Sequence, residues 1–445
     1  MLKATDLFPV VQRTEQWIDS HRKDTEHGVV WGLADEAPDK HFKTLYAGSA
    51  GIALFYLELL QAKEDARYRE LALKAGQELL DYTSDLSTLP CAPMGGFAGY
   101  AFVFSELAAR LEVPEFAAAA RQMIEKQYQL AQPVGGGIGW VQDMPYARLT
   151  GHTGIREIFD IAEGAAGAGI YFLYAHKQGL HEQALQWSKQ AADRLLEVAE
   201  PAKGGLRWQM MPDIPWPFDS PNFEHGTAGV AYFFALLYEL TGEDQYLDAA
   251  LKGAAHVTAV TQSMEGGGRL VPHILDDDLP HRFYLGLCHG PVGTNRLFHV
   301  LHRITGERQW STWKEEFELG LLSTGAPEER SEGYWNNVSQ CCCDAGVGDY
   351  ALSQFHCTGN ERYLELADRV AREVLRRAVD DGTHCKWPQA EHRTSPEYIQ
   401  AQTGYMQGAA GVASFLLHLA TTLDGSPTKI PVSYTHLTLP TICSV

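Results

Sequence analysis

Cysteine and histidine side chains gather at two places in the chain, Cys288-His289 and Cys341-Cys342. Three thiolates can hold a zinc ion and leave one coordination position open, as in catalytic rather than structural zinc sites. The chain has no C-x-x-C pair, which argues against a small structural zinc finger. Cys288, Cys341 and Cys342 are therefore predicted zinc ligands. The alternative interpretation is that they are small buried thiols, because free cysteine packs as a small hydrophobe.

A histidine and an aspartate elsewhere in the chain are suited to moving protons. Beside a zinc cluster, His225 is expected to act as a general acid or base. Asp160 either orients His225, shares the proton transfer or only caps a helix. His289 is a candidate metal ligand, second acid–base group or hydrogen-bond donor to a ligand. Whether Cys343 joins the metal site is left open by the sequence.

These residues lie in or just before copies of one short signature. Gly-x-x-Gly, followed by an apolar run, occurs seven times, with Cys343 in place of the first glycine in the sixth copy. The final glycines are 48 to 68 residues apart, and they are Gly51, Gly99, Gly167, Gly229, Gly293, Gly346 and Gly411. A recurring period of this size indicates a repeat architecture. Equivalent positions on neighbouring repeats can then meet at one site.

Each repeat reads as a pair of helices. The run from Val230 to Leu240 is apolar nearly all round, as expected of a helix buried on several sides. A turn such as Thr241-Gly242 follows, and then an amphipathic outer helix such as residues 363–376. Glycine- and tryptophan-rich connectors lead to the next repeat. No polar capping repeat is evident, so the pattern predicts an all-α fold in which seven inner/outer helical hairpins close into an α/α toroid.

Bulk composition narrows the classes of function. The chain has 445 residues, a formal net charge of −20 and no basic stripe, which argues against nucleic-acid binding. No apolar stretch reaches the roughly 18 residues that a transmembrane helix requires. The eight cysteines do not suggest a disulfide framework, and the N-terminus lacks the pattern of a signal peptide, so a cytoplasmic location is expected. Residues 1–431 are expected to form one domain, and residues 432–445 resemble a translated adapter sequence.

Over residues 1 to 431, the chain resembles the lanthionine synthetase C-like (LanC-like) family. The resemblance rests on the seven repeats, on Asp160 in the segment 159–164 and on His225 in the segment 224–229. It also rests on the segment 287–290 around Cys288 and on Gln340-Cys341-Cys342. Two departures from the family pattern stand out. A Cys-Cys pair replaces the commoner Cys-His, and Cys343 replaces the glycine that usually follows, which leaves the ligand register open by one residue.

The resemblance implies an α/α toroid with zinc at its centre and addition of a thiol to dehydroalanine or dehydrobutyrine, forming a thioether. It implies that Cys288, Cys341 and Cys342 hold the zinc, that His225 is the acid–base residue and that Asp160 assists it. The thiol is expected to come from a peptide cysteine or a small thiol such as glutathione. A separate dehydratase would make the dehydro residue.

Two other classes of function compete with this interpretation. α/α toroids also host carbohydrate-active enzymes, for which 10 tryptophans and 19 tyrosines would suit sugar stacking and Asp160 with Glu163 would supply paired carboxylates. That hypothesis leaves the three cysteines unexplained. A non-catalytic zinc- or thiol-binding scaffold is the third hypothesis, and metal binding without turnover would support it.

Overall fold

The computed structural model describes residues 1–84, 89–91, 94–143, 153–211, 219–275, 282–330, 337–390 and 396–426. The adapter-like segment 432–445 lies outside the described residues. Contacts divide the chain into two compact units. The first comprises Met1–Ser87, Gly99–Ala120 and Trp335–Val445, and the second comprises Thr88–Ala98 and Arg121–Tyr334.

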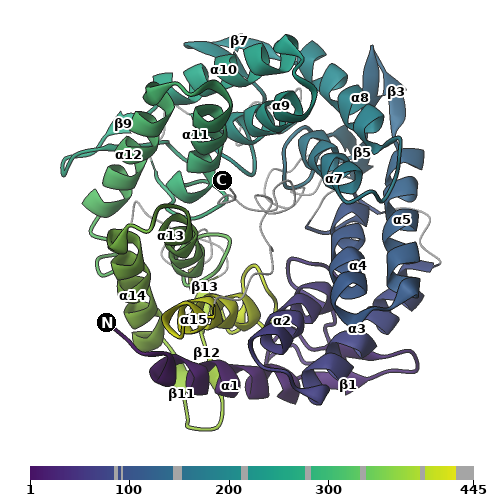
Figure 1. Ribbon diagram of the computed structural model, residues 1–445, viewed down its shortest axis with the longest axis vertical. Helices are drawn as coiled ribbons and strands as arrows, with labels where there is room; N and C mark the ends of the chain where they lie inside the picture. The colour runs from purple at the N-terminus through teal and green to yellow at the C-terminus, as the bar shows by residue number, and fades with distance from the viewer. Residues whose placement is uncertain are drawn as a thin grey trace. The chain divides into compact units, whose positions relative to one another are not determined.

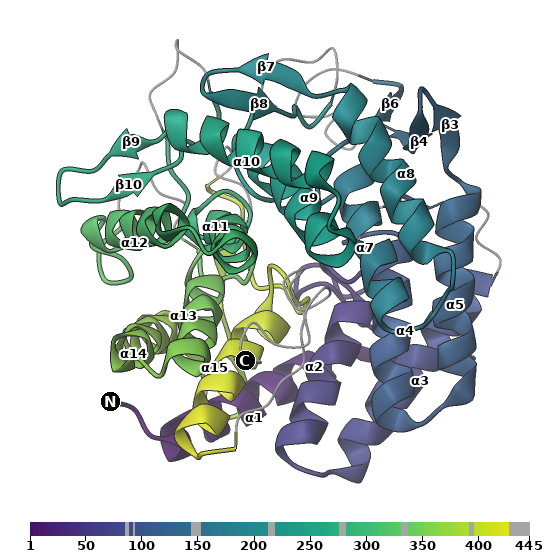
Figure 2. The ribbon, with the colours of Figure 1, turned by 45° about the horizontal axis from the view of Figure 1, so that its top comes forward.

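Seven helices begin at or next to the signatures, as the repeat pattern predicts. Their side chains are buried on nearly every side, and α9, for example, is buried from Thr227 through Leu237. Within the first unit, α15 contacts both α13 and α2, and within the second, α9 contacts both α7 and α11 (Figures 1 and 2). These inner helices are α2 (Ser49–Ala62), α4 (Phe97–Leu111), α7 (Ala165–Lys177), α9 (Thr227–Thr241), α11 (Pro291–Thr305), α13 (Asp344–Thr358) and α15 (Ala409–Leu423).

An amphipathic helix packs against each inner helix. Most follow their inner helix directly, and three inner helices end at a left-handed glycine, Gly242, Gly306 or Gly359, as expected of such turns. The seventh hairpin is different, because the partner of α15 is α1 at the start of the chain (Figure 1). The outer helices are α1 (Ala4–Ser20), α3 (Ala66–Ser84), α5 (Pro114–Gln129), α8 (Ala184–Glu197), α10 (Asp244–Ala259), α12 (Arg308–Ser323) and α14 (Glu361–Arg376).

The final glycine of the signature allows two close approaches. A Cβ at Gly411 would lie 1.9 Å from the carbonyl oxygen of Tyr405 in the same repeat and 2.7 Å from Cγ of Gln340 in the preceding repeat. Any larger residue would therefore push both away. The preceding repeat makes the equivalent side-chain contact from Tyr405 to Gly51, from Ile161 to Gly229 and from Phe223 to Gly293. The signature thus serves packing between repeats as well as the start of the helix.

The connectors between hairpins contain short antiparallel ribbons, which the sequence analysis did not predict. Glycines with positive φ, such as Gly135 at 57° and Gly204 at 83°, form the tight turns that these ribbons need. The pairs are β1 (Arg22–Asp24) with β2 (Val29–Trp31), β3 (Gln132–Val134) with β4 (Gly137–Gly139), β5 (Val141–Asp143) with β6 (Ile155–Glu157), β7 (Glu200–Ala202) with β8 (Gly205–Arg207), β9 (Gln262–Ser263) with β10 (Arg269–Leu270), β11 (Val379–Asp380) with β12 (Cys385–Lys386), and β13 (Gln389–Ala390) with β14 (Ile399–Gln400).

The connector tryptophans close the C-terminal ends of outer helices. Nε1 of Trp208 donates a hydrogen bond to the carbonyl oxygen of Leu195, in the last turn of α8, at 2.7 Å. Trp140 and Trp387 make the same bond to a carbonyl 13 residues earlier, both at 2.8 Å. Each bond satisfies a carbonyl at a helix end and fixes the ribbon on its helix. Among the described residues, no helix combines the length and apolarity that crossing a membrane requires.

Candidate functional site

The turns that precede the inner helices are joined to one another by main-chain hydrogen bonds within each unit. In the second unit, the N–H of Ala162 donates to the carbonyl of Glu224 at 3.2 Å, and the N–H of Glu224 donates to that of Cys288 at 3.0 Å. In the first unit, Cys341 donates to Met406 at 3.0 Å, and Met406 donates to Tyr46 at 2.9 Å. All of these residues stand five positions before the final glycine of their repeat. Equivalent positions of consecutive repeats are therefore direct neighbours within each unit.

Asp160 and His225 form a hydrogen-bonded pair across two such turns. Nδ1 of His225 lies 2.8 Å from Oδ2 of Asp160, which is fully buried. The other carboxylate oxygen, Oδ1, accepts the main-chain N–H of Glu163 at 2.7 Å. Ser339 and Thr44 make the same bond to the third residue after them, so Asp160 also occupies a capping position of the repeat. Orienting His225 and capping the turn, two of the three roles that the sequence left open for Asp160, are thus both compatible with its contacts.

The electrostatics of this pair favour a charged histidine. Burial opposes the imidazolium, but the hydrogen bond and negative charge of Asp160 outweigh it and raise the pKa of His225 to about 9. An imidazolium that donates through Nδ1 presents Nε2 as its second proton-bearing nitrogen. Burial and the charge of Asp160 together raise the pKa of the Glu163 carboxyl to about 7. The second unit therefore holds two groups close together whose protonation differs from that of an exposed side chain.

Cys288 and His289 lie on the next turn of the same unit. Cys288 is buried, and the His289 ring lies 5.2 Å from the His225 ring between centroids. His273 and Tyr284 also pack on His289, with centroids at 4.4 and 5.5 Å. The structure thus brings His289 beside the Asp160–His225 pair. Neither His273 nor Tyr284 stands at a repeated position, so the signature alignment gave no signal for them.

Cys341, Cys342 and Cys343 lie in the turn before α13, in the first unit. All three are buried, and Cys343 is the N-terminal cap residue of α13, in the place that glycine takes in the other signatures. Nε2 of Gln407 donates to Sγ of Cys342 at 3.3 Å and to the hydroxyl of Tyr46 at 2.7 Å. An amide N–H directed at sulfur favours the thiolate over the neutral thiol.

Gln407 was not singled out by the sequence analysis, although a signal for it exists. It stands four positions before the final glycine, as do His225, His289 and Cys342 in their repeats. Of the six predicted site residues, Asp160, His225, Cys288 and His289 belong to the second unit. Cys341 and Cys342 belong to the first.

The sequence was compared with models of known protein families. Residues 41–214 match the model of the family "Lanthionine synthetase C-like protein". The expected resemblance to this family is confirmed. No curated protein matches the chain by sequence.

Solved structures resemble the whole fold. A nisin cyclase aligns over 98% of this chain and 96% of its own with a TM-score of 0.57 and 12% identity. The Lin0763 protein of Listeria innocua aligns over 97% of this chain and 100% of its own, with a TM-score of 0.50 and 12% identity. With the helical hairpins described above, these similarities confirm the α/α-toroid fold class. A GH76 α-mannanase of Bacteroides thetaiotaomicron reaches a TM-score of only 0.49 at 14% identity, over 94% and 96% of the two chains.

Proposed function

We propose that this protein is a zinc-dependent LanC-like cyclase that adds a thiol to dehydroalanine or dehydrobutyrine and so forms a thioether. The observation that carries the proposal is the arrangement of consecutive turns in the second unit. The Asp160–His225 pair and the turn of Cys288 and His289 are joined through the main chain of Glu224. A proton-handling pair and a thiol therefore occupy neighbouring repeats.

The zinc ligands of the proposal are Cys288, Cys341 and Cys342. Each offers one sulfur atom, a soft donor that suits zinc, and Cys342 accepts an amide N–H that favours its thiolate. Cys288 and Cys341 stand at equivalent positions of the fifth and sixth repeats.

The protein's own groups then provide for proton transfer. Zinc, when bound, would lower the pKa of an incoming thiol and hold it as a thiolate. As the C–S bond forms and the double bond of the dehydro residue opens, its α-carbon must gain a proton. With a pKa of about 9, His225 is charged at neutral pH and supplies that proton as a general acid. Asp160 holds Nδ1–H and stabilises the charged ring, so Nε2 is the nitrogen that delivers the proton. His289, packed beside His225, is the proposed further acid–base group or ligand donor.

The proposed substrate is a dehydrated peptide, in keeping with the fold similarity to a nisin cyclase. Glutathione or another small thiol would serve as an alternative nucleophile. A separate dehydratase is the proposed source of the dehydro residue, and the proposed location is cytoplasmic. A carbohydrate-active enzyme fits less well, because both carboxylate oxygens of the fully buried Asp160 already accept hydrogen bonds. That carboxylate is poorly placed to serve a sugar substrate.

The test is a thiol-addition assay on purified, zinc-loaded protein with a dehydrated peptide that contains cysteine. Ring closure leaves the peptide mass unchanged and removes the free thiol, so alkylation followed by mass spectrometry detects it. Wild type and a His302→Gln control, altered at an exposed histidine of α11, should cyclise the peptide. Cys288→Ala and His225→Asn should not. Zinc-loaded wild type that never consumes the thiol of any dehydrated peptide or added glutathione would contradict the proposal.

A further inference from the structure

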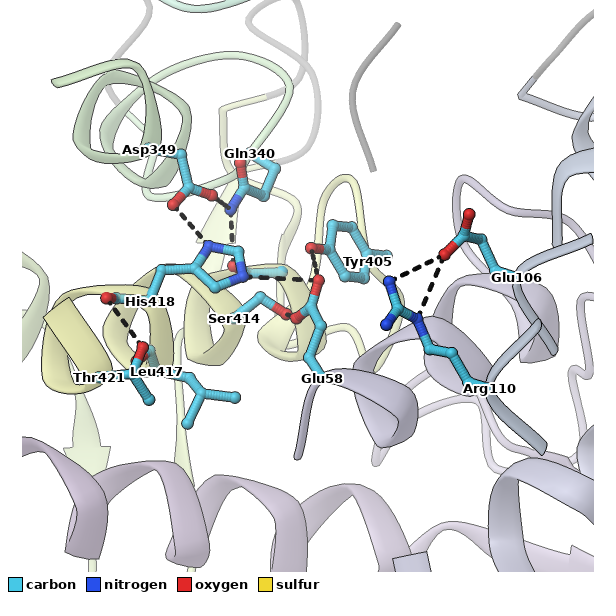
Figure 3. Close-up of polar contacts among 11 residues, drawn as sticks. Glu58, Glu106, Arg110, Gln340, Asp349, Tyr405, Ser414, Leu417, His418 and Thr421 are labelled. Atoms are coloured by element: carbon cyan, nitrogen blue, oxygen red, sulfur yellow. Dashed lines mark hydrogen bonds and ion pairs between the residues drawn. The ribbon is translucent and has the colours of Figure 1, made fainter. Parts of the chain in front are cut away.

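A largely buried charged network lies among the inner helices of the first unit. His418 on α15 lies between two carboxylates, with Nδ1 2.9 Å from Oδ1 of Asp349 on α13 and Nε2 3.6 Å from Oε1 of Glu58 on α2 (Figure 3). Glu58 is fully buried and accepts hydrogen bonds from the hydroxyls of Tyr405, at 2.9 Å, and Ser414. Three inner helices are thus linked through one imidazole.

Stability alone does not account for such a network. Taking charges out of water is costly, and well-packed apolar residues in their place are often as stable or more stable. The second unit shows that alternative. His418 and Glu58 stand seven positions after the final glycine of their signatures, where the second unit has Tyr174, Leu236 and Val300. The same fold therefore tolerates uncharged side chains at this depth of its inner helices.

One hydrogen bond on each side, from Gln340 to Asp349 and from Tyr405 to Glu58, links the network to the turn that carries Cys341 and Cys342. Nε2 of Gln340 donates to Oδ2 of Asp349 at 2.6 Å and to the carbonyl of Gly411 at 2.9 Å (Figure 3). Gln340 immediately precedes Cys341. On the other side, Tyr405 bonds Glu58 and immediately precedes Met406, whose carbonyl accepts the N–H of Cys341. The network therefore holds both sides of the Cys341–Met406 main-chain bond.

Gln340 and Tyr405 are departures from the repeat at their position. They stand six residues before the final glycine, and each packs against the final glycine of the next repeat. The described equivalents in other repeats are buried and apolar, namely Leu45, Ile161, Phe223 and Leu287. Packing at this position requires no polar group. Among the described equivalents, polar side chains occur at this position only in the sixth and seventh repeats, which the Cys341–Met406 bond joins.

We propose that the Glu58–His418–Asp349 network positions the Cys341–Cys342 turn, through Gln340 on one side and Tyr405 on the other. Gln340, Asp349 and His418 act as positioning residues and touch neither substrate nor reacting atoms. This inference rests on the proposed function, because it assigns the turn to metal binding. It adds that the geometry of the turn is set by groups inside the inner helices.

The test uses the full chain with Gln340→Leu, because leucine already fills this position in the first and fifth repeats. The variant keeps the packing and removes the link to Asp349. Zinc affinity, measured by competition with a chromophoric chelator, should fall about 10- to 100-fold, as for other groups that orient metal ligands. The visible spectrum of the Co²⁺-loaded protein should change with it. Tyr405→Phe, which removes one hydroxyl, should shift both readouts in the same direction but less.

The matched control is Glu106→Gln. Glu106 stands at the position of Glu58 in the next repeat, but its carboxylate pairs with Arg110 of its own helix (Figure 3). Its zinc affinity and Co²⁺ spectrum should equal those of wild type. If wild type binds zinc and both folded test variants keep its zinc affinity and Co²⁺ spectrum, the positioning role alone is overturned. Wild type that binds no zinc would overturn the proposed function, and this inference with it.

Discussion

The two units each contain a histidine paired through Nδ1 with an aspartate, and the pairs differ in what surrounds them. In the second unit, His225 meets the buried Asp160 in the turns before the inner helices. In the first, His418 meets Asp349 inside the inner helices, and its Nε2 faces a second carboxylate, Glu58. Burial opposes the charge of His418, but Asp349 and Glu58 outweigh it and hold its pKa well above the ordinary value.

The comparison shows how one pairing can serve two purposes. A histidine with a carboxylate at each nitrogen is held charged and joins helices together. A histidine that bonds a carboxylate through one nitrogen only, in the turns before the inner helices, can transfer the proton on its other nitrogen to a substrate. We therefore assign chemistry to His225 and positioning to His418.

The largest effect is expected from His225→Asn. Thiol addition should fall about 10²- to 10⁴-fold, the usual contribution of a general acid, because the α-carbon loses its proton donor. Zinc content should remain that of wild type, since the substitution touches none of the proposed ligands. Single-turnover cyclisation and metal analysis on the same preparation separate the two effects. Near-normal cyclisation by this variant would remove His225 from the mechanism.

His418→Leu is expected to act on stability. The substitution leaves the fully buried Glu58 and the partly exposed Asp349 without the cation between them, which should lower the free energy of unfolding by about 3 kcal/mol. The double variant Glu58→Gln/His418→Leu should recover part of that loss, because it also removes one of the carboxylates. Denaturant unfolding of both variants measures the difference. Wild-type stability in His418→Leu would mean that the imidazole carries no charge in the network.

A pH profile distinguishes the pairs further. Activity of the wild type should fall as pH rises through about 9, where His225 loses its proton. In Asp160→Asn that limb should move toward the ordinary histidine pKa of about 6.5, which lowers activity at pH 8 roughly 30-fold. The pair also contributes stability, which is fully present below pH about 6.5 and is lost as pH rises through about 9. A pH profile that does not move in Asp160→Asn would contradict the claim that Asp160 raises the pKa of His225.

The smallest effect is expected from Glu106→Gln. Its partner Arg110 lies one turn along the same helix at 3.1 Å and is partly exposed, so the ion pair should contribute at most about 1 kcal/mol. Denaturant unfolding checks this value. A loss comparable to that of His418→Leu would show that charge at this depth stabilises the fold outside the Glu58–His418–Asp349 network as well, and the contrast drawn above would fail.

Local signals in the sequence predict the inner helices well. An apolar run after a glycine signature marks a helix start regardless of the rest of the chain, and all seven such helices were expected. The pairing of α1 with α15 was not foreseen, because it joins the two ends of the chain and no local pattern records it. The connector ribbons are only two or three residues long and too short for a period-2 pattern to show.

The candidate site divides in the same way. Asp160, His225, Cys288 and Cys341 stand at or near repeated positions, so aligning the repeats was sufficient to select them. His273, Tyr284 and the Glu58–His418–Asp349 network were missed, because their contacts depend on how side chains from different repeats meet. Gln407 had an aligned position, but an amide carries less obvious chemistry than a thiol or an imidazole.

The most direct test of the account is the zinc content of purified wild type, Cys288→Ala and Cys342→Ala. Cys385→Ala serves as the matched control, because Cys385 is a buried thiol in β12 and no proposed ligand. We expect about one zinc per chain in wild type and in Cys385→Ala, and loss of zinc from both other variants. Wild type prepared without chelator under reducing conditions that contains no zinc, or variants that keep it, would contradict the three-thiolate site.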